Sequence, residues 1–307
     1  MADWNVRLFG KPSLQCYGKP WSGSDATVAM EIFLFLLSHR RIVHNRETLA
    51  SLLWGECSTY QSRKHLRQTL WRLRSCDSLP LKMKRTFLLS IDKDHIQLNP
   101  EIEYWVDTEL FEQTYLQTKG CQNSDETNNQ RMREAVQLYR GGFLEGYWYD
   151  WCLFERERFQ NMYMTMLDKL IESCLCRKSF EEGLDYGERI LRLDPASERT
   201  HQQMMRLHHL SGNRTAALRQ FERCGRQLKE ELGVAPSTTT LKIWEQIRAD
   251  GVVPEFPSLP ETDPQIPLAL PHLLGRLKQF QNKLTELHKQ IQKEIDLVEN
   301  YLPNQTD

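Results

Sequence analysis

The sequence of 307 residues contains no long apolar run. Its longest uninterrupted apolar stretch, 32–37, is far shorter than the roughly 18 residues that a membrane-spanning helix needs. Residues 1–4 also lack the basic flank and the following apolar segment of a secretory signal. These two absences predict a soluble, cytoplasmic protein that has no contact with a membrane.

The chain also lacks the motifs of metal sites and of common enzymes. Its eight cysteines form no C-x-x-C pair, and Cys174 and Cys176 stand as a lone C-x-C that favours reduced cysteines over a zinc site. The phosphate-binding, dinucleotide-binding, zinc-protease and serine-hydrolase motifs are missing. His208 and His209 adjoin on an expected helix and are more typical of packed or solvent-facing side chains than of ligands. The sequence therefore predicts no enzyme, no metal and no cofactor.

Charge is unevenly spread along the chain. Residues 1–99 hold 15 Lys and Arg against 8 Asp and Glu, a net charge of +7, while the rest of the chain carries −8. Within 40–85 the two counts are 11 and 3. A nearly neutral protein with one concentrated basic segment indicates an anionic partner for that segment.

The first hundred residues have the pattern of a winged helix-turn-helix, an α+β fold. A strand pair, three helices and a β-hairpin follow one another, and the second and third helices would form the helix-turn-helix. Alternating apolar residues indicate the strands, and apolar residues at helical spacing indicate the helices. The expected elements are two strands within 5–17, helices at about 25–39, 45–55 and 58–74, and short strands within 81–98 that turn at 92–94.

The third of these helices has one apolar and one basic face. Leu66, Leu70 and Leu73 share a side and are predicted to be buried. No carboxylate occurs between 57 and 76, although an ordinary solvated helix mixes charges because opposite pairs stabilise it. Arginine and lysine fit guanine edges, and glutamine fits adenine. A merely basic solvated helix is the alternative. The expected DNA-contacting residues are Arg63, Lys64, Arg67, Gln68, Trp71 and Arg72.

A second basic cluster, Lys82, Lys84 and Arg85, opens the expected hairpin. Contact of the wing with DNA phosphates is one interpretation of these residues. Protection of an exposed strand edge by lysines is the other, and the sequence favours neither.

From about residue 106 the pattern becomes helical. An offset of 34 residues aligns Leu170 with Met204 and Gly183 with Ala217, which is the period of tetratricopeptide repeats. Small residues are expected where paired helices approach closely. An irregular helical bundle is the alternative. The expected helices outside the two repeats are 107–118, 128–139, 153–176 and 237–249.

The last part of the chain combines a proline-rich stretch with an amphipathic helix. Residues 252–271 contain six prolines and are expected to form an extended linker. In the following helix, at about 272–301, apolar residues recur every seven positions, with Glu294 interrupting one seam. This pattern predicts a coiled-coil homodimer, or else a helix that folds back onto the repeats. The expected dimerisation residues are Leu277, Phe280, Leu284, Leu287, Ile291 and Val298.

Several motifs resemble known bacterial regulators. Residues 138–147, Leu-Tyr-Arg-Gly-Gly-Phe-Leu-Glu-Gly-Tyr, followed by Trp151 and Glu-Arg-Glu-Arg at 155–158, resemble the bacterial transcriptional activator domain. Residues 49–55 and 66–74 resemble the winged helix that precedes this domain in SARP-type activators. Further matches to the activator domain lie at 189–198, 204–207, 216–222 and 231–237.

The resemblance covers about 250 residues and implies a protein that binds promoter DNA repeats and recruits RNA polymerase. The nucleotide-binding module of larger relatives is not part of it, so ATP-driven switching is not implied. The residues themselves leave open a helical-repeat adaptor whose basic N-terminal part binds an acidic protein or RNA. The expected divisions are a winged-helix domain at 1–104, a TPR-like all-α domain at 105–251, a linker at 252–271 and an amphipathic helix at 272–307.

Overall fold

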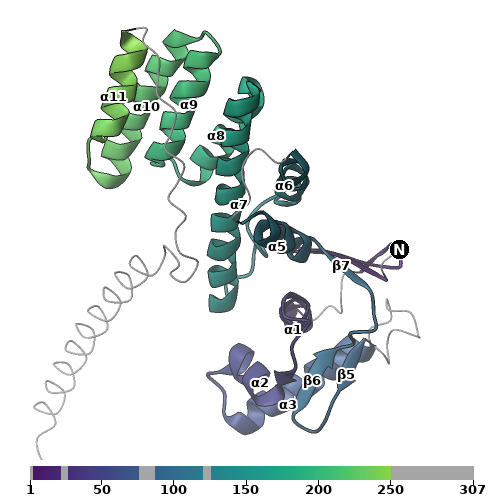
Figure 1. Cartoon of the computed structure of the whole chain (residues 1–307). Helices are drawn as coiled ribbons and strands as arrows, with labels where there is room; N and C mark the ends of the chain where they lie inside the picture. Colours follow the sequence, from purple (N-terminus) through teal and green to yellow (C-terminus); the bar gives the residue numbers. More distant parts are fainter. Residues whose placement is uncertain (1–2, 22–26, 76–86, 120–125, 250–307) are drawn as a thin grey trace, which may run out of the picture. The chain divides into compact units, whose positions relative to one another are not determined.

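The computed structural model describes residues 3–21, 27–75, 87–119 and 126–249. These residues lie in the first of two compact units, which comprises residues 1–253. Their fold is the expected mixed one, with a winged helix-turn-helix followed by stacked helices (Figure 1). The proline-rich stretch and the amphipathic helix lie outside the described residues.

The chain begins in a four-stranded sheet with the strand order β3-β2-β1-β7. The two predicted strands are confirmed as β1 (Trp4–Arg7) and β2 (Ser13–Cys16), which pair antiparallel. β3 (Lys19–Trp21) and β7 (Tyr104–Val106) were not predicted, because three residues give too little alternation. β7 pairs parallel with β1 across about a hundred residues of sequence, and it leads directly into the helical part.

The three predicted helices of the winged helix are confirmed. They are α1 (Thr27–Ser38), α2 (Arg46–Trp54) and α3 (Thr59–Ser75). Asn45 caps α2, because its side-chain oxygen accepts hydrogen bonds from the amides of Glu47 and Thr48.

A second, three-stranded sheet forms the wing, with the order β4-β6-β5. Its strands are β4 (His44–Asn45), β5 (Leu88–Ser90) and β6 (His95–Leu98). The turn expected at 92–94 is confirmed, because Asp92 accepts the amides of Asp94 and His95 at 2.7 Å each. The first part of the expected hairpin, 81–86, lies outside the described residues.

Seven helices follow β7 in the described part of the chain, and the helices expected at 107–118 and 128–139 are among them. Consecutive helices pack against one another in antiparallel pairs (Figure 1). Their bounds are α5 (Asp107–Thr118), α6 (Glu126–Leu138), α7 (Asp150–Arg177), α8 (Phe180–Leu193), α9 (Glu198–Leu210), α10 (Arg214–Leu232) and α11 (Thr238–Arg248).

Small residues let these helices approach as the repeat predicted. A Cβ on Gly183 of α8 would lie 3.1 Å from the Cβ of Cys174 and 3.1 Å from a methyl of Leu207. Ala217, at the equivalent position of α10, is fully buried. The 34-residue offset therefore reflects a real structural repeat.

The winged helix and the first helices of the helical part share one hydrophobic core, and a second, smaller cluster lies among α9, α10 and α11. Phe9, next to β1, packs edge-on against Phe111 of α5 at 5.0 Å and against Phe159 of α7 at 5.3 Å between ring centroids. Burial of several large aromatic rings in one continuous cluster stabilises both halves together. The orientation of the winged helix on the repeats is therefore fixed by packing.

The segment between α6 and α7 holds this junction through the backbone. Its amides and carbonyls pair with the chain after β1, as in the bonds from Leu144 N to Leu8 O at 2.8 Å and from Gly10 N to Gly142 O at 2.9 Å. Gly146 has a φ of +93°, a conformation that side chains disfavour. Gly146 is thus required by the backbone of this docking segment, defined as 140–149.

Arg156 of α7 holds the docking segment in place. Its Nε donates to Phe143 O at 2.9 Å, and its Nη2 donates to Leu144 O at 2.9 Å and Tyr147 O at 3.0 Å. The side chains of Phe143 and Leu144 are buried, so water does not readily replace the guanidinium. One planar donor group bonds three carbonyls of the turn, of which Leu144 O also accepts the Tyr147 amide at 3.1 Å.

A buried carboxylate lies at the same junction. Asp107, the first residue of α5, is 2% exposed and accepts the amides of Leu8 at 2.8 Å, Phe9 at 3.2 Å and Thr108 at 2.8 Å. Burial raises the pKa of the Asp107 carboxyl to about 6, although the three amides oppose this rise. Asp107 thus ties the end of β1 to the start of the helical part.

Candidate nucleic-acid interface

The recognition face is the side of α3 that faces away from the core. Leu66, Leu70 and Leu73 are 2%, 3% and 0% exposed, as predicted, and they pack in the same core as α1 and α2. The opposite side of the helix must therefore face solvent. The residues exposed there are Arg63, Lys64, Arg67, Gln68, Trp71 and Arg72.

The turn between α2 and α3 fixes the direction of this helix. Ser62 is 5% exposed, and its hydroxyl contacts Trp54 O at 2.9 Å and Ser58 O at 3.1 Å. His65 stacks on the indole of Trp54 with ring centroids 5.7 Å apart. Ser62 did not stand out in the sequence, because a serine among basic residues looks like surface. Its role depends on a carbonyl eight residues away, which only the fold supplies.

One of the six recognition residues has a carboxylate partner. Arg63 lies 3.0 Å from Glu47 of α2, and both side chains are more than half exposed. An exposed pair of this kind contributes under about 1 kcal/mol, so DNA could displace it at little cost. Lys64, Arg67 and Arg72 form no ion pair with any described residue. The recognition face therefore keeps a strongly positive charge.

Two groups of expected site residues lie outside the described residues. They are the wing residues Lys82, Lys84 and Arg85, and the dimerisation residues Leu277, Phe280, Leu284, Leu287, Ile291 and Val298.

Next to the recognition face, the fold brings together three residues that sequence reasoning did not connect. Arg46 begins α2, Arg74 lies in the last turn of α3, and Ser90 ends β5. Arg46 Nη2 donates to Ser90 Oγ at 3.0 Å, and Arg74 Nη2 donates to the same oxygen at 3.1 Å. Arg74 also donates to Leu88 O at 3.2 Å. No spacing in the sequence could have indicated this cluster.

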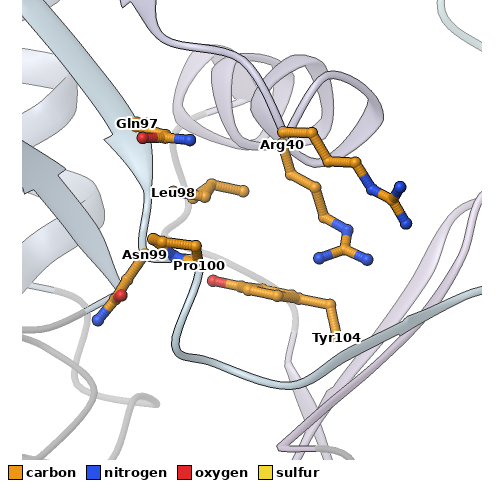
Figure 2. A pocket seen from close by; sticks show the side chains of 7 residues that line it. Arg40, Gln97, Leu98, Asn99, Pro100 and Tyr104 are labelled. Carbon is orange, nitrogen blue, oxygen red and sulfur yellow. The ribbon is translucent and has the colours of Figure 1, made fainter.

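A small cavity of about 280 Å³ lies on the winged helix between the end of α1 and the loop before β7. Figure 2 shows Arg40 extending over the Tyr104 ring, and the guanidinium lies 5.5 Å from the ring centroid. Both hydrogen bonds of Arg40 go to the Glu109 carboxylate at 2.5 Å. Arg41 lies 3.6 Å from the same carboxylate, so the geometry fits a link between the segment after α1 and α5.

The described residues contain no group of His, Cys, Asp and Glu side chains that could hold a metal ion. Their six cysteines are all free thiols. Within the same residues, no helix is long and apolar enough to cross a membrane.

Comparison with known proteins gives a family for the helical part. The family model of the bacterial transcriptional activator domain matches residues 106–248, which run from the end of β7 to the end of α11. Residues 106–248 are therefore a bacterial transcriptional activator domain. The winged helix before this domain agrees with the SARP-type resemblance seen in the sequence.

A solved structure has the same overall fold. EmbR of Mycobacterium tuberculosis, solved in complex with a low-affinity phosphopeptide, matches with a TM-score of 0.67 at 16% sequence identity. The match covers 83% of this chain and 67% of that chain. No curated protein matches the sequence. The family consists of transcriptional regulators and not of enzymes, in agreement with the missing catalytic motifs.

Proposed function

We propose that this protein is a SARP-type, sequence-specific DNA-binding activator of transcription. The observation that carries the proposal is the recognition face of α3. Its exposed side chains are mainly cations and an amide, and they lie opposite the buried leucine stripe. The helix that carries them is the second helix of a helix-turn-helix. In such folds the second helix enters the major groove of DNA.

Within this proposal, Lys64, Arg67, Gln68 and Arg72 enter the major groove. Gln68 and Arg72 are the residues that bind base edges. An amide can bond adenine N6 and N7 at the same time, and a guanidinium can bond guanine O6 and N7. Trp71, which is 68% exposed, offers a large flat side chain to the same groove. Lys82, Lys84 and Arg85 are assigned to phosphates beside the wing.

The activator domain is proposed to contact RNA polymerase, and the support for this is the family alone. A protein with these partners would act in the cytoplasm. We keep the divisions at 1–104, 105–251, 252–271 and 272–307 as proposals for the winged helix, the activator domain, the linker and the terminal helix.

We also propose that the terminal helix joins two chains into a homodimer, because its apolar residues recur every seven positions. Two winged helices on one DNA would raise the affinity through effective concentration. Their half-sites should be about 10–11 base pairs apart, or a multiple of this, so that both meet one face of the duplex.

Selection of bound fragments from a genomic DNA library with the purified full chain tests the DNA-binding proposal. Gln68→Ala or Arg72→Ala should weaken binding to the selected site by about 1–3 kcal/mol and relax the preference at one base pair. Arg226→Ala on α10, also an exposed arginine, is the matched control and should keep the preference.

Two results would contradict this proposal. One is a pool of fragments with no common sequence. The other is a uniform loss of affinity across all sequences with Gln68→Ala and Arg72→Ala, which would mean that α3 reads no bases. Tighter binding to RNA or to an acidic protein than to duplex DNA would favour the adaptor instead.

A further inference from the structure

Two arginines share one hydroxyl beside the recognition face. Because Arg46 and Arg74 both donate to Ser90 Oγ, their terminal nitrogens lie within about 6 Å of each other. Two like charges at this separation repel each other unless an anion lies between them. The arrangement is therefore unfavourable in the free protein.

No described carboxylate balances this pair. Neither Arg46 nor Arg74 forms an ion pair within the described residues, and the buried Nε of Arg46 has no hydrogen-bond partner. Burial and the neighbouring charge of Arg46 lower the pKa of Arg74. By contrast, Arg199 on the helical repeats is held by the two carboxylates of Asp168 and Glu172. The Arg46–Arg74 pair is thus short of negative charge.

The position of the pair matches the path expected for DNA. Seven residues, about two turns, separate Arg67 from Arg74, so both extend from the same side of α3. Arg46 is the first residue of α2, whose N-terminal end carries a partial positive charge. In a helix-turn-helix the first helix crosses the phosphate backbone while the second enters the groove. The pair therefore lies where a phosphate would pass.

Ser90 is exposed and offers the remaining donor. Its oxygen accepts from both arginines, so its own O–H hydrogen is available to an incoming oxyanion. A phosphate at this point would accept bonds from three directions and place negative charge between the two guanidinium groups.

We propose that Arg46, Arg74 and Ser90 form a binding site for one backbone phosphate of DNA, here called the phosphate clamp. The inference rests on the proposed DNA-binding function. It adds contact residues that belong neither to the recognition face nor to the wing residues Lys82, Lys84 and Arg85. The clamp joins α2, α3 and β5 to a single phosphate. It therefore fixes the register of α3 in the groove and carries no sequence information itself.

Binding of the full chain to the selected site and to an unrelated duplex of equal length, across a range of salt concentrations, tests the clamp. Arg46→Gln and Arg74→Gln should each weaken both duplexes by about tenfold, and each should reduce the slope of log K against log salt by about one. Arg226→Gln, with the same loss of charge on α10, should change neither.

Thermal unfolding in low salt gives a second signature. Because Arg46→Gln removes a repulsion and breaks no side-chain bond to the backbone, it should unfold at the same temperature as the wild type or above it. Arg74→Gln also loses the bond to Leu88 O, so the thermal comparison uses Arg46→Gln. A structural role would instead lower the unfolding temperature and leave the salt slope unchanged, and this result would overturn the clamp.

The outcomes separate the clamp from the function on which it rests. If the wild type binds its site and Gln68→Ala relaxes the preference, but Arg46→Gln and Arg74→Gln match Arg226→Gln, only the clamp is wrong. If the wild type binds no duplex at all, both proposals are overturned.

Discussion

Arg156→Lys should destabilise the fold although it keeps the positive charge. The guanidinium of Arg156 reaches the carbonyls of Phe143, Leu144 and Tyr147 at 2.9, 2.9 and 3.0 Å. The single ammonium group of lysine cannot take the place of two nitrogens set apart on a rigid plane. We expect lysine to keep one of the three bonds and to lose the other two.

The cost follows from the burial of Phe143 and Leu144, which are 1% and 0% exposed. A hydrogen bond from a charged group contributes about 1.5–3 kcal/mol, and a buried acceptor left without a partner costs a similar amount. Some relaxation of the docking segment should recover part of this loss. Two lost bonds therefore predict a decrease of about 2–4 kcal/mol in the free energy of unfolding.

Urea unfolding at neutral pH, followed by circular dichroism, measures this difference. Arg158→Lys is the matched control on the same helix, because Arg158 pairs with Glu112 and Glu155 at a partly exposed position. It should cost less than about 1 kcal/mol. Equal effects of the two substitutions would refute the argument that Arg156 acts through its three carbonyls.

Three further predictions follow. Leu70→Ala should destabilise the winged helix by about 2–5 kcal/mol in thermal unfolding, and a silent Leu70→Ala beside a destabilising Gln68→Ala would mean that α3 is rotated. Burial raises the pKa of the Asp107 carboxyl from 3.8 to about 6, so folding favours its protonated form. The contribution of this group to the stability of the fold is therefore present at low pH and is lost as the pH rises through 6. The free energy of unfolding of the wild type minus that of Asp107→Asn should therefore fall between about pH 4 and 6, and a rise across this window would contradict the shift. In sedimentation at micromolar concentration the full chain should be a dimer and a chain ending at residue 252 a monomer, and a monomeric full chain would exclude the terminal helix as the dimer contact.

Local patterns were enough to predict much of this structure. The leucine spacing of α3 determined which side is buried, because a helix of that period can place only one stripe in the core. Asn45 marked the start of α2, since its side chain caps the first amides. The offset between Gly183 and Ala217 indicated paired helices, because only small residues allow such close approach. Each of these signals lies within one helix or one repeat.

Other features depended on contacts between distant parts of the chain. The pairing of β7 with β1 joins residues about a hundred positions apart, and three residues give too weak a pattern to reveal it. The ion pair of Arg63 with Glu47 and the meeting of Arg46 with Arg74 need two helices and a strand to be placed first.

The sequence by itself therefore determined the recognition face of α3, its net charge and the repeat, because periodicity and charge are local properties of the chain. Only the tertiary structure decided which cations have partners, because an ion pair depends on distances that helix packing sets. The same packing joined the winged helix to the activator domain. The docking segment, Arg156 and Asp107 act there through backbone groups, which the identity of neighbouring residues does not reveal.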